Sequence, residues 1–224
     1  MQKTILVTGG NRGIGLETCK QLAAMGHTVI MGSRNLEKGQ EKAKAIDGNV
    51  IAKQLDVTSE ASINALKAEI QAEFGKLDVL INNAGIMSED NVSDVSIEEQ
   101  KRVMETNVWA PMRMVQIFVP LLNNSDDPRI VNLSSQMGQR MNQTADHSAY
   151  RLSKFTLNGL TLQLANALPN IKVNAMHPGW VKTDMGGSSA PLSVEEGADT
   201  SVWLATADNI PSGKLFCCRE LMEW

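Results

Sequence analysis

The chain has few cysteines and few aromatic residues, and neither sign of charge dominates it. The three cysteines, Cys19, Cys217 and Cys218, are odd in number and lack the spacing of a disulfide framework or a zinc site. Lysine and arginine are scattered, and the formal net charge is -4. The basic surface typical of nucleic-acid binding is therefore missing, and we expect neither a nucleic-acid partner nor a metal centre.

Long hydrophobic runs are absent as well. No apolar stretch approaches the roughly 20 residues that a helix needs to span a bilayer, so we expect no membrane contact and a cytoplasmic protein. A length of 224 residues is enough for one sizeable core, and no repeat, linker or shift in composition divides it. The sequence predicts a single domain over residues 1–224.

Short apolar runs rich in β-branched residues alternate with amphipathic stretches along the whole chain. The predicted strands cover residues 4–8, 28–32, 50–55, 77–81, 129–133, 171–176 and 214–217, the last as a closing edge strand. The predicted helices cover residues 16–25 and 36–46, a stretch from a Thr58 or Ser59 cap to Phe74, a stretch from a Ser96 cap, residues 103–122, the segment that carries Tyr150, and residues 194–206. This alternation predicts an α/β protein with a single doubly wound parallel sheet, the Rossmann fold, flanked by helices. Polar residues at the carboxyl ends of its strands are then candidates for a binding site.

A glycine-rich turn, Gly9-Gly10-Asn11-Arg12-Gly13-Ile14-Gly15, joins the first predicted strand to the first predicted helix. Glycines allow backbone N–H groups to approach a phosphate, and the N-terminus of a helix favours an anion. In the order strand, turn and helix, this pattern indicates nucleotide binding.

The second predicted strand leads to Ser33 and Arg34, where NAD-binding proteins of this kind carry an acidic residue that holds the ribose. A guanidinium at this place would instead bind the 2′-phosphate of NADP, and Arg12 in the glycine turn would be a second clamp. The pattern favours NADPH/NADP+ over NAD. The alternative interpretation is that Arg34 only begins the next helix.

Tyr150 and Lys154 lie four residues apart, so both project from one face if their segment is helical. A nearby ammonium group would lower the pKa of the phenol from its usual value near 10, which suits it to acid–base chemistry. The alternative is an ordinary surface pair. Asn107, inside a predicted helix, is either a satisfied core amide or a kinked functional position.

Taken together, these residues resemble the short-chain dehydrogenase/reductase family over essentially the whole chain. The motifs that carry the resemblance are Thr8-Gly9 through Gly15, Asn82-Asn83-Ala84-Gly85, Asn107, Ser135, Tyr150-x-x-x-Lys154 and Pro178-Gly179-x-x-x-Thr183. The resemblance implies an oxidoreductase that reduces an aldehyde or ketone to an alcohol by hydride transfer from NADPH. It implies that Tyr150 donates the proton, that Lys154 lowers the pKa of Tyr150 and holds the nicotinamide ribose, and that Ser135 binds the substrate oxygen. Asn107 would hold a water that relays protons to Lys154.

The resemblance also implies the residues that bind the cofactor. Gly9, Gly13, Ile14 and Gly15, with Asn11 in the same turn, would hold the pyrophosphate, and Asp56 and Val57 the adenine. The nicotinamide half would lie against Tyr150, Lys154, Asn83, Ala84, Gly85, Pro178, Gly179, Val181 and Thr183.

Three further segments, Trp180–Met185, Ser201–Ala205 and Pro211–Phe216, are similar to the carbonyl-reductase branch of the family, which is NADPH-dependent and reduces aldehydes and ketones, often broadly. The chain lacks the long insertion that some members carry before the catalytic tyrosine, which permits the family's usual helix-pair homodimer. The short segment between Thr183 and Ser193 suggests an open pocket. Its candidate walls are Ile86, Met87, Met137, Met141, Trp180 and Met185.

Two other functions stay open on the sequence alone. A 3-oxoacyl thioester reductase would share the motifs, although the acidic charge weighs against binding of an acyl carrier. A non-catalytic protein that senses NADP would need neither Tyr150 nor Lys154. We expect His147 and His177 to be structural, Cys19 to lie in the core, and Cys217 and Cys218 to be two packed thiols rather than a strained redox pair.

Overall fold

One mostly parallel sheet organises the computed structural model, which describes residues 1–224. Its eight strands lie in the order β3-β2-β1-β4-β5-β6-β7-β8. The strands are β1 (Thr4–Thr8), β2 (Thr28–Ser33), β3 (Val50–Gln54), β4 (Val79–Asn82), β5 (Arg129–Leu133), β6 (Lys172–Met176), β7 (Lys214–Cys217) and β8 (Glu220–Met222). All neighbours are parallel except β7 and β8. The predicted doubly wound α/β fold is confirmed, but the prediction that residues 214–217 form the edge strand is wrong, because the short strand β8 covers them.

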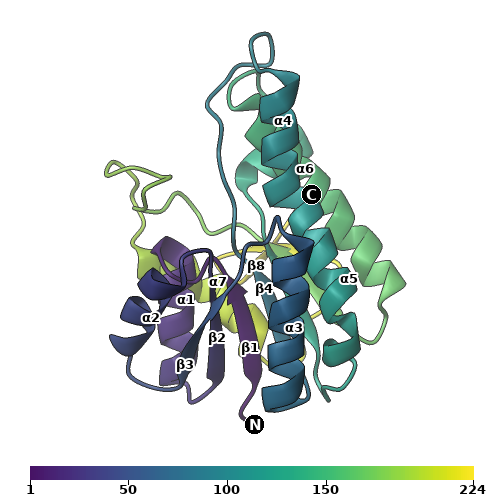
Figure 1. The fold of residues 1–224 in the computed structure, drawn as a ribbon. Coiled ribbons are helices and arrows are strands. Elements are labelled where there is room, and N and C mark those ends of the chain that lie inside the picture. Colours follow the sequence, from purple (N-terminus) through teal and green to yellow (C-terminus); the bar gives the residue numbers. More distant parts are fainter.

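Helices cover both faces of this sheet (Figure 1). One face carries α1 (Gly13–Ala24), α2 (Leu36–Lys44) and α7 (Val194–Thr206), and the other carries α3 (Glu60–Phe74), α5 (Ala110–Leu122) and α6 (Ser148–Ala167). Ser59, one of the two predicted caps, accepts a hydrogen bond from the Ser62 backbone N–H at the start of α3. None of the helices is long and apolar enough to cross a lipid bilayer.

Residues that alternate along the strands build a separate core on each face. Ile5 and Val7 of β1 pack with Leu22 of α1, whereas Leu6 between them packs with Phe118 of α5 on the other side. All five are completely buried. Parallel strands covered on both faces are expected to be apolar throughout, which is why β1 and β4 show no polar alternation. Cys19 of α1 lies in the first core, as its position in the helix predicts.

The predicted helix over residues 103–122 has a different form in the structure. Helix α4 (Ile97–Met104) continues through a π-helical turn (Glu105–Trp109) into α5 without leaving the helical path. Helix α4 rises beyond the carboxyl edge of the sheet, as Figure 1 shows, and packs on α6. A π-helical turn inserts an extra residue, and such turns concentrate at functional positions. Asn107 lies within it.

Candidate active site

The carboxyl ends of β1 and β4 lie side by side, and beyond them the chain runs to opposite halves of the sheet. Thr8 Oγ1 accepts hydrogen bonds from the backbone N–H groups of Asn83 at 3.0 Å and Ala84 at 2.9 Å. In return, Asn83 Nδ2 donates to the carbonyl oxygens of Thr8 at 2.7 Å and Gly9 at 3.2 Å. These four bonds join the glycine turn to the Asn82–Gly85 segment at the topological switch point, where ligands bind in open α/β sheets.

The geometry of the glycine turn suits the pyrophosphate of a dinucleotide. Gly9 and Gly13 have positive φ angles of 63° and 51°. A Cβ on Gly15 would lie 2.3 Å from Asn83 Nδ2, so that no side chain fits between the turn and β4. Helix α1 begins at Gly13 with no side-chain cap and no acidic residue in its first turn, which leaves its N–H groups and its dipole available to an anion.

The predicted NADP-selecting residues lie at the rim of this turn. Arg34 follows β2 directly and is exposed, and no carboxylate stands at the end of that strand. The guanidinium of Arg12 is exposed too, but its Nη1 lies 3.3 Å from Oδ2 of Asp184 in the segment after β6. The carboxylate of Asp56, predicted to contact adenine, accepts from the backbone N–H and the hydroxyl of Thr58 and thereby shapes the turn after β3.

Tyr150 and Lys154 are buried, with 9% and 5% of their surfaces exposed. Lys154 Nζ donates to the Leu133 carbonyl oxygen at 2.7 Å and lies 5.5 Å from the centre of the Tyr150 ring. Burial lowers the pKa of Lys154 to about 8. Burial likewise raises the pKa of Tyr150, while the hydroxyl of Ser135 beside it acts in the opposite direction.

The sequence-based expectation of a Tyr150 pKa below its usual value is therefore wrong, because desolvation outweighs the groups that favour the phenolate. The ammonium group lies toward the face of the ring and is tied to the end of β5, while desolvation opposes the phenolate. The outcome is a phenol that keeps its proton near neutral pH. That is the state in which a tyrosine can donate a proton to a carbonyl oxygen.

Ser135 is held in place by contacts between its loop and α6. The residue follows β5 and begins a short 3₁₀ turn, Gln136–Gly138, where Ser135 Oγ accepts from the Met137 backbone N–H at 3.1 Å. A Cβ on Gly138 would lie 2.7 Å from the carbonyl carbon of Lys154, so this turn rests directly on α6. Asn158, which was not predicted from the sequence, donates from Nδ2 to the Gly138 carbonyl oxygen at 3.0 Å and accepts at Oδ1 from Ser134 Oγ at 2.5 Å.

Asn107 uses its whole side chain to connect the site. Its Oδ1 accepts from the Ile86 backbone N–H at 2.9 Å, and its Nδ2 donates to the Ile86 carbonyl at 2.8 Å and to Ser153 Oγ at 2.9 Å. Of the two interpretations of Asn107, the structure supports both, since the amide is satisfied and the helix around it is distorted. Ser153 was also missed, although a serine immediately before Lys154 on the buried side of α6 is the feature that indicates it.

A buried polar chain, not predicted from the sequence, anchors α6 to the sheet. Asn82 Nδ2 donates to Asn132 Oδ1 at 2.9 Å, and Asn132 Nδ2 donates to Thr161 Oγ1 at 2.9 Å. Asparagine is rare inside buried strands, so its presence near the ends of β4 and β5 is the feature that could have indicated this chain.

The segment after β6 closes one side of the site. Val181 is buried, and the methyl group of Thr183 lies 3.4 Å from a Cβ placed on Gly13, which brings this segment against the glycine turn. The backbone N–H of Gly179 donates to His177 Nδ1, and burial lowers the pKa of His177 to about 4, so this imidazole is uncharged near neutral pH.

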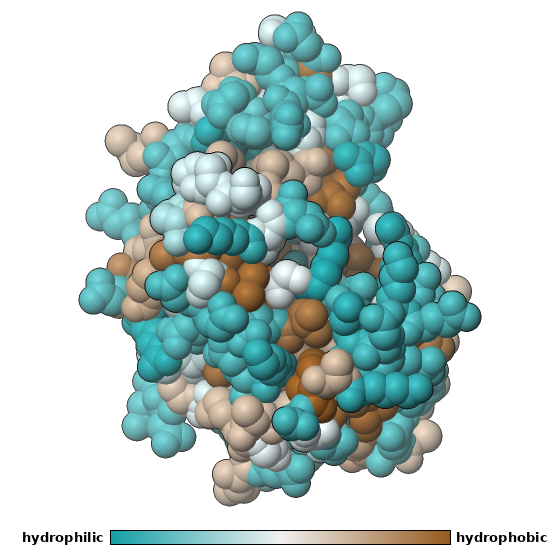
Figure 2. Space-filling model, turned by 90° about the vertical axis from the view of Figure 1, so that its left-hand side faces the viewer, coloured by the Kyte–Doolittle hydropathy of each residue, from teal (hydrophilic) through white to brown (hydrophobic).

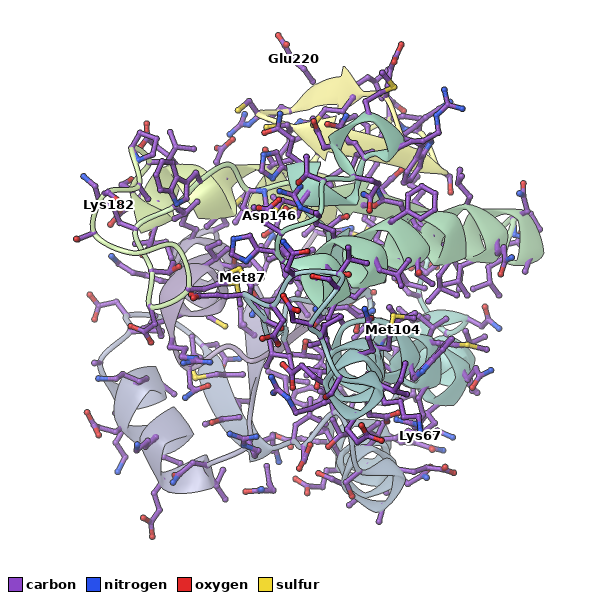
Figure 3. All side chains as sticks on the ribbon, turned by 90° about the horizontal axis from the view of Figure 1, so that it is seen from above. Lys67, Met87, Met104, Asp146, Lys182 and Glu220 are labelled. Carbon is purple, nitrogen blue, oxygen red and sulfur yellow. The ribbon has the colours of Figure 1, made fainter.

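The predicted pocket walls divide into two groups. Ile86, Met87 and Met137 are half-buried, and Ile86 and Met137 contact Asn107 and Ser135 respectively, whereas Trp180 and Met185 are exposed on the segment after β6. Figure 2, which views the left-hand side of Figure 1, shows hydrophobic residues around a recess in the middle of the surface. Seen from above in Figure 3, Met87 and Asp146 lie near the centre of the view and Lys182 at the outer edge of its loop.

Met141 does not belong to this group, which corrects the prediction. It is 81% exposed and lines a separate groove of about 860 Å³ on the outer side of α6. That groove is formed by the π-helical turn, α5, α6 and the C-terminal Trp224. Met141 belongs to the 3₁₀ turn Arg140–Asn142, and both Arg140 and Met141 line this outer groove.

Comparisons with known proteins agree with this geometry. The short chain dehydrogenase family matches residues 3–191. A (+)-neomenthol dehydrogenase from Arabidopsis thaliana is 35% identical, with 98% of this chain and 97% of the relative covered, and a salutaridine reductase from Papaver somniferum is 32% identical, with 98% and 96% covered. The NADPH-bound carbonyl reductase from chicken fatty liver has a TM-score of 0.90 and 30% identity, covering 100% of this chain and 99% of its own. The first alignment extends over 287 positions, whereas this chain has 224 residues, so that relative carries segments absent here.

Proposed function

Because the chain belongs to the short-chain dehydrogenase family, we propose that it is an NADPH-dependent oxidoreductase that reduces a small or medium apolar aldehyde or ketone to the alcohol. The observation that carries this proposal is a protonated, buried Tyr150 beside Ser135 and Lys154, at the strand ends next to an anion-binding glycine turn. The carbonyl-reductase and salutaridine-reductase relatives support the same class of reaction.

The residues around the glycine turn fit NADPH. The turn and the start of α1 would hold the pyrophosphate, Arg12 and Arg34 the 2′-phosphate, and Lys154 the nicotinamide ribose. The absence of a carboxylate after β2 supports NADPH over NADH, because nothing there repels a second phosphate. When bound, NADPH supplies the hydride, and the protein supplies orientation and proton transfer.

Ser135 and Tyr150 would then act together on the substrate oxygen. The Ser135 hydroxyl donates a hydrogen bond to this oxygen and stabilises the negative charge that develops on it. Tyr150 Oη delivers its proton to the same oxygen and becomes a phenolate. Lys154 still carries most of its charge near neutral pH, since its pKa is about 8, and it stabilises the phenolate across the ring. In the reverse direction Tyr150 would accept the proton of the alcohol.

Asn107 and Lys154 could share a water that returns protons to the site. A Cβ placed on Gly85 would lie 3.3 Å from Asn107 Oδ1 and 3.6 Å from Lys154 Nζ, so both groups face the same small space. Both hydrogens of the Asn107 amide are already used, and a relay water would therefore donate to an oxygen of Asn107. Asn107 would thus assist proton transfer without touching the substrate.

The test is NADPH oxidation by the purified protein with an aromatic aldehyde, a cyclic dione, a cyclic ketone and a 3-oxoacyl thioester, each repeated with NADH. We expect turnover of the first three with NADPH. Tyr150→Phe should lower kcat by about 10²- to 10⁴-fold and leave NADPH binding intact, since it removes only the proton donor. Activity confined to the thioester would assign the protein to fatty-acid chemistry. NADPH binding without turnover would support the cofactor-sensing alternative, and equal rates in Tyr150→Phe would contradict the role of Tyr150 as proton donor.

The outer side of α6 is the surface proposed for a homodimer. Trp109, Leu152 and Phe155 are each more than two-fifths exposed there, beside the groove described above. This face lies on the helix pair through which the family resemblance implies dimerisation. Light scattering should give twice the mass of one chain for the wild-type protein. For Phe155→Glu, it should give the mass of a single chain. The cytoplasmic location expected from the sequence stays a prediction.

A further inference from the structure

Two cysteines occupy the hairpin that joins β7 to β8, and the proposed reduction uses neither. Cys217 is the last residue of β7, and Cys218 and Arg219 form the turn before β8. Both turn residues have positive φ angles, 52° for Cys218 and 64° for Arg219, as in a type I′ turn. Consecutive strand residues point to opposite faces, but this turn brings the two Sγ atoms within 3.5 Å of each other.

The two thiols differ in their access to solvent. Cys218 is exposed, whereas Cys217 is half-buried. Burial, together with the neighbouring Cys218 thiol, raises the pKa of Cys217 to about 11, so this thiol is protonated near neutral pH. A reagent from solution therefore meets Cys218 first. Cys217 is placed to react second, with the Cys218 sulfur already beside it.

We propose that Cys217 and Cys218 form a reversible redox site, at which a low-molecular-weight disulfide such as oxidised glutathione converts the two thiols into a disulfide between neighbouring residues. The Cys218 thiolate attacks one sulfur of the reagent, forms a mixed disulfide and releases one thiolate. Cys217 then loses its proton to solvent as its sulfur attacks Cys218 Sγ, which closes the bond and displaces the second thiolate. The protein loses two electrons and two protons, and the reagent is reduced to two thiols.

The separation of adjacent residues makes this bond easy to reverse. Neighbouring Cα atoms are about 3.8 Å apart, whereas ordinary disulfides join Cα atoms about 4.4–6.8 Å apart. The sulfurs must also approach from 3.5 Å to about 2.05 Å, which requires the turn to change its backbone angles. Such strained disulfides are more readily reduced than structural ones, which is the behaviour of a regulatory site.

The turn is anchored to the sheet and to α7, so a change within it must move the residues that follow. The Arg219 backbone N–H donates to Thr200 Oγ1 at 3.1 Å, and its guanidinium forms an ion pair with Asp199 of α7. Figure 3 shows Glu220, the next residue, at the outer margin of the molecule, with its side chain pointing into solvent. With Arg219 held, β8 and the C-terminal residues are the part free to shift.

The C-terminal residues contact the loop that carries the site. The Glu223 carbonyl oxygen accepts a hydrogen bond from Gln139 Nε2 at 2.7 Å. Gln139 lies between Ser135 and Tyr150, directly after the 3₁₀ turn that rests on Lys154. Closure of the disulfide should weaken the contact between Gln139 and Glu223 and loosen residues 136–147.

The first test is the intact mass of the full-length protein after equilibration with mixtures of reduced and oxidised glutathione. We expect the protein mass to fall by two hydrogens, with no glutathionyl group attached to the protein. Excess reduced glutathione should restore the original mass. Cys217→Ser should instead gain one glutathionyl group, because Cys218 reacts but no second thiol displaces the adduct. Cys19, which is completely buried, should stay unmodified. No change in mass, two glutathionyl groups on the wild-type chain, or a disulfide-linked dimer would overturn the proposal.

The second test concerns the connection to the loop, and it does not depend on the proposed carbonyl reduction. Hydrogen exchange of residues 136–147 and 220–224 should become several-fold faster in the oxidised protein than in the reduced protein. The double variant Cys217→Ser/Cys218→Ser, treated in the same way, should show no change. If the disulfide forms and exchange in residues 136–147 stays the same, the connection between the redox site and the substrate loop is wrong.

Discussion

Arg12 in the glycine turn and Asp184 in the segment after β6 form an ion pair, with 3.3 Å between Arg12 Nη1 and Asp184 Oδ2. The two residues come from opposite ends of the sequence, and both are exposed. If Arg12 also binds the 2′-phosphate of NADPH, Asp184 competes with the cofactor for the same guanidinium. The pair then opposes NADPH binding and has no effect on NADH, which lacks that phosphate.

Asp184→Asn should therefore strengthen NADPH binding. An exposed ion pair contributes about 0.2–1 kcal/mol, so the Kd for NADPH should fall by up to about fivefold. The Kd for NADH should stay the same, and both can be measured by cofactor fluorescence. Asp126→Asn, which removes an exposed carboxylate elsewhere, is the matched control for net charge. An equal change for the two cofactors would show that Arg12 does not face the ribose.

Arg34→Asp should shift the cofactor preference from NADPH towards NADH. The change removes a guanidinium that is exposed at the end of β2 and adds a carboxylate that repels the 2′-phosphate. Loss of a hydrogen bond to a charged group costs about 1.5–3 kcal/mol, which corresponds to a shift of roughly 10- to 100-fold in the ratio of kcat/KM values. An unchanged ratio would mean that Arg34 only begins α2.

Burial of Lys154 should make stability depend on pH in the alkaline range. Its pKa is about 8 in the folded protein and near 10.5 when unperturbed, so the unfolded chain binds more protons between these values. The free energy of unfolding should therefore rise from pH 8 to pH 10 by about 2 kcal/mol relative to Lys154→Met, which cannot titrate there. Urea unfolding at several pH values measures this difference, and parallel curves for the two proteins would contradict it.

Gly138→Ala should reduce activity by displacing Ser135 relative to α6. The new Cβ would lie 2.7 Å from the Lys154 carbonyl carbon, so the backbone of either the 3₁₀ turn or α6 must move. A displacement of about 1 Å at a catalytic group lowers kcat by roughly 10²-fold. Gly159→Ala on α6 is the matched control, since nothing lies within 4 Å of its Cβ. That variant should keep full activity and gain about 0.5–1 kcal/mol from its higher helix propensity.

Asp127 should stabilise the fold far from the site. Although its burial acts in the opposite direction, hydrogen bonds from Arg129, Lys3 and Lys172 hold the pKa of Asp127 below its usual value. This stabilisation is complete above the unfolded pKa near 3.9 and is lost as pH falls through the lower folded value. Asp127→Asn should cost about 2 kcal/mol at pH 7, because it leaves the buried Arg129 with fewer partners. Asp126→Asn should leave the stability unchanged. Thermal unfolding of the wild-type protein and both variants at pH 7 and pH 3 tests this.

The order of strands and helices could be predicted because it depends on local patterns. The runs over residues 4–8 and 129–133 match β1 and β5 in both bounds, and Ser96 caps a helix where the sequence places it. Strand β8 was missed because Glu220–Met222 is short, exposed and without alternation. The π-helical turn at Asn107 was missed as well, because its register depends on contacts with Ile86 and Ser153 rather than on the helix sequence.

The chemical groups available to this protein, and the family they resemble, follow from the sequence, since the glycine turn, Ser135, Tyr150 and Lys154 are recognisable by type and spacing. Their charge states and partners do not. Burial raises the pKa of Tyr150 above its usual value, and Arg12 meets Asp184 because the segment after β6 folds back over the glycine turn. Both outcomes depend on desolvation and on contacts between residues far apart in the chain, which no local pattern contains.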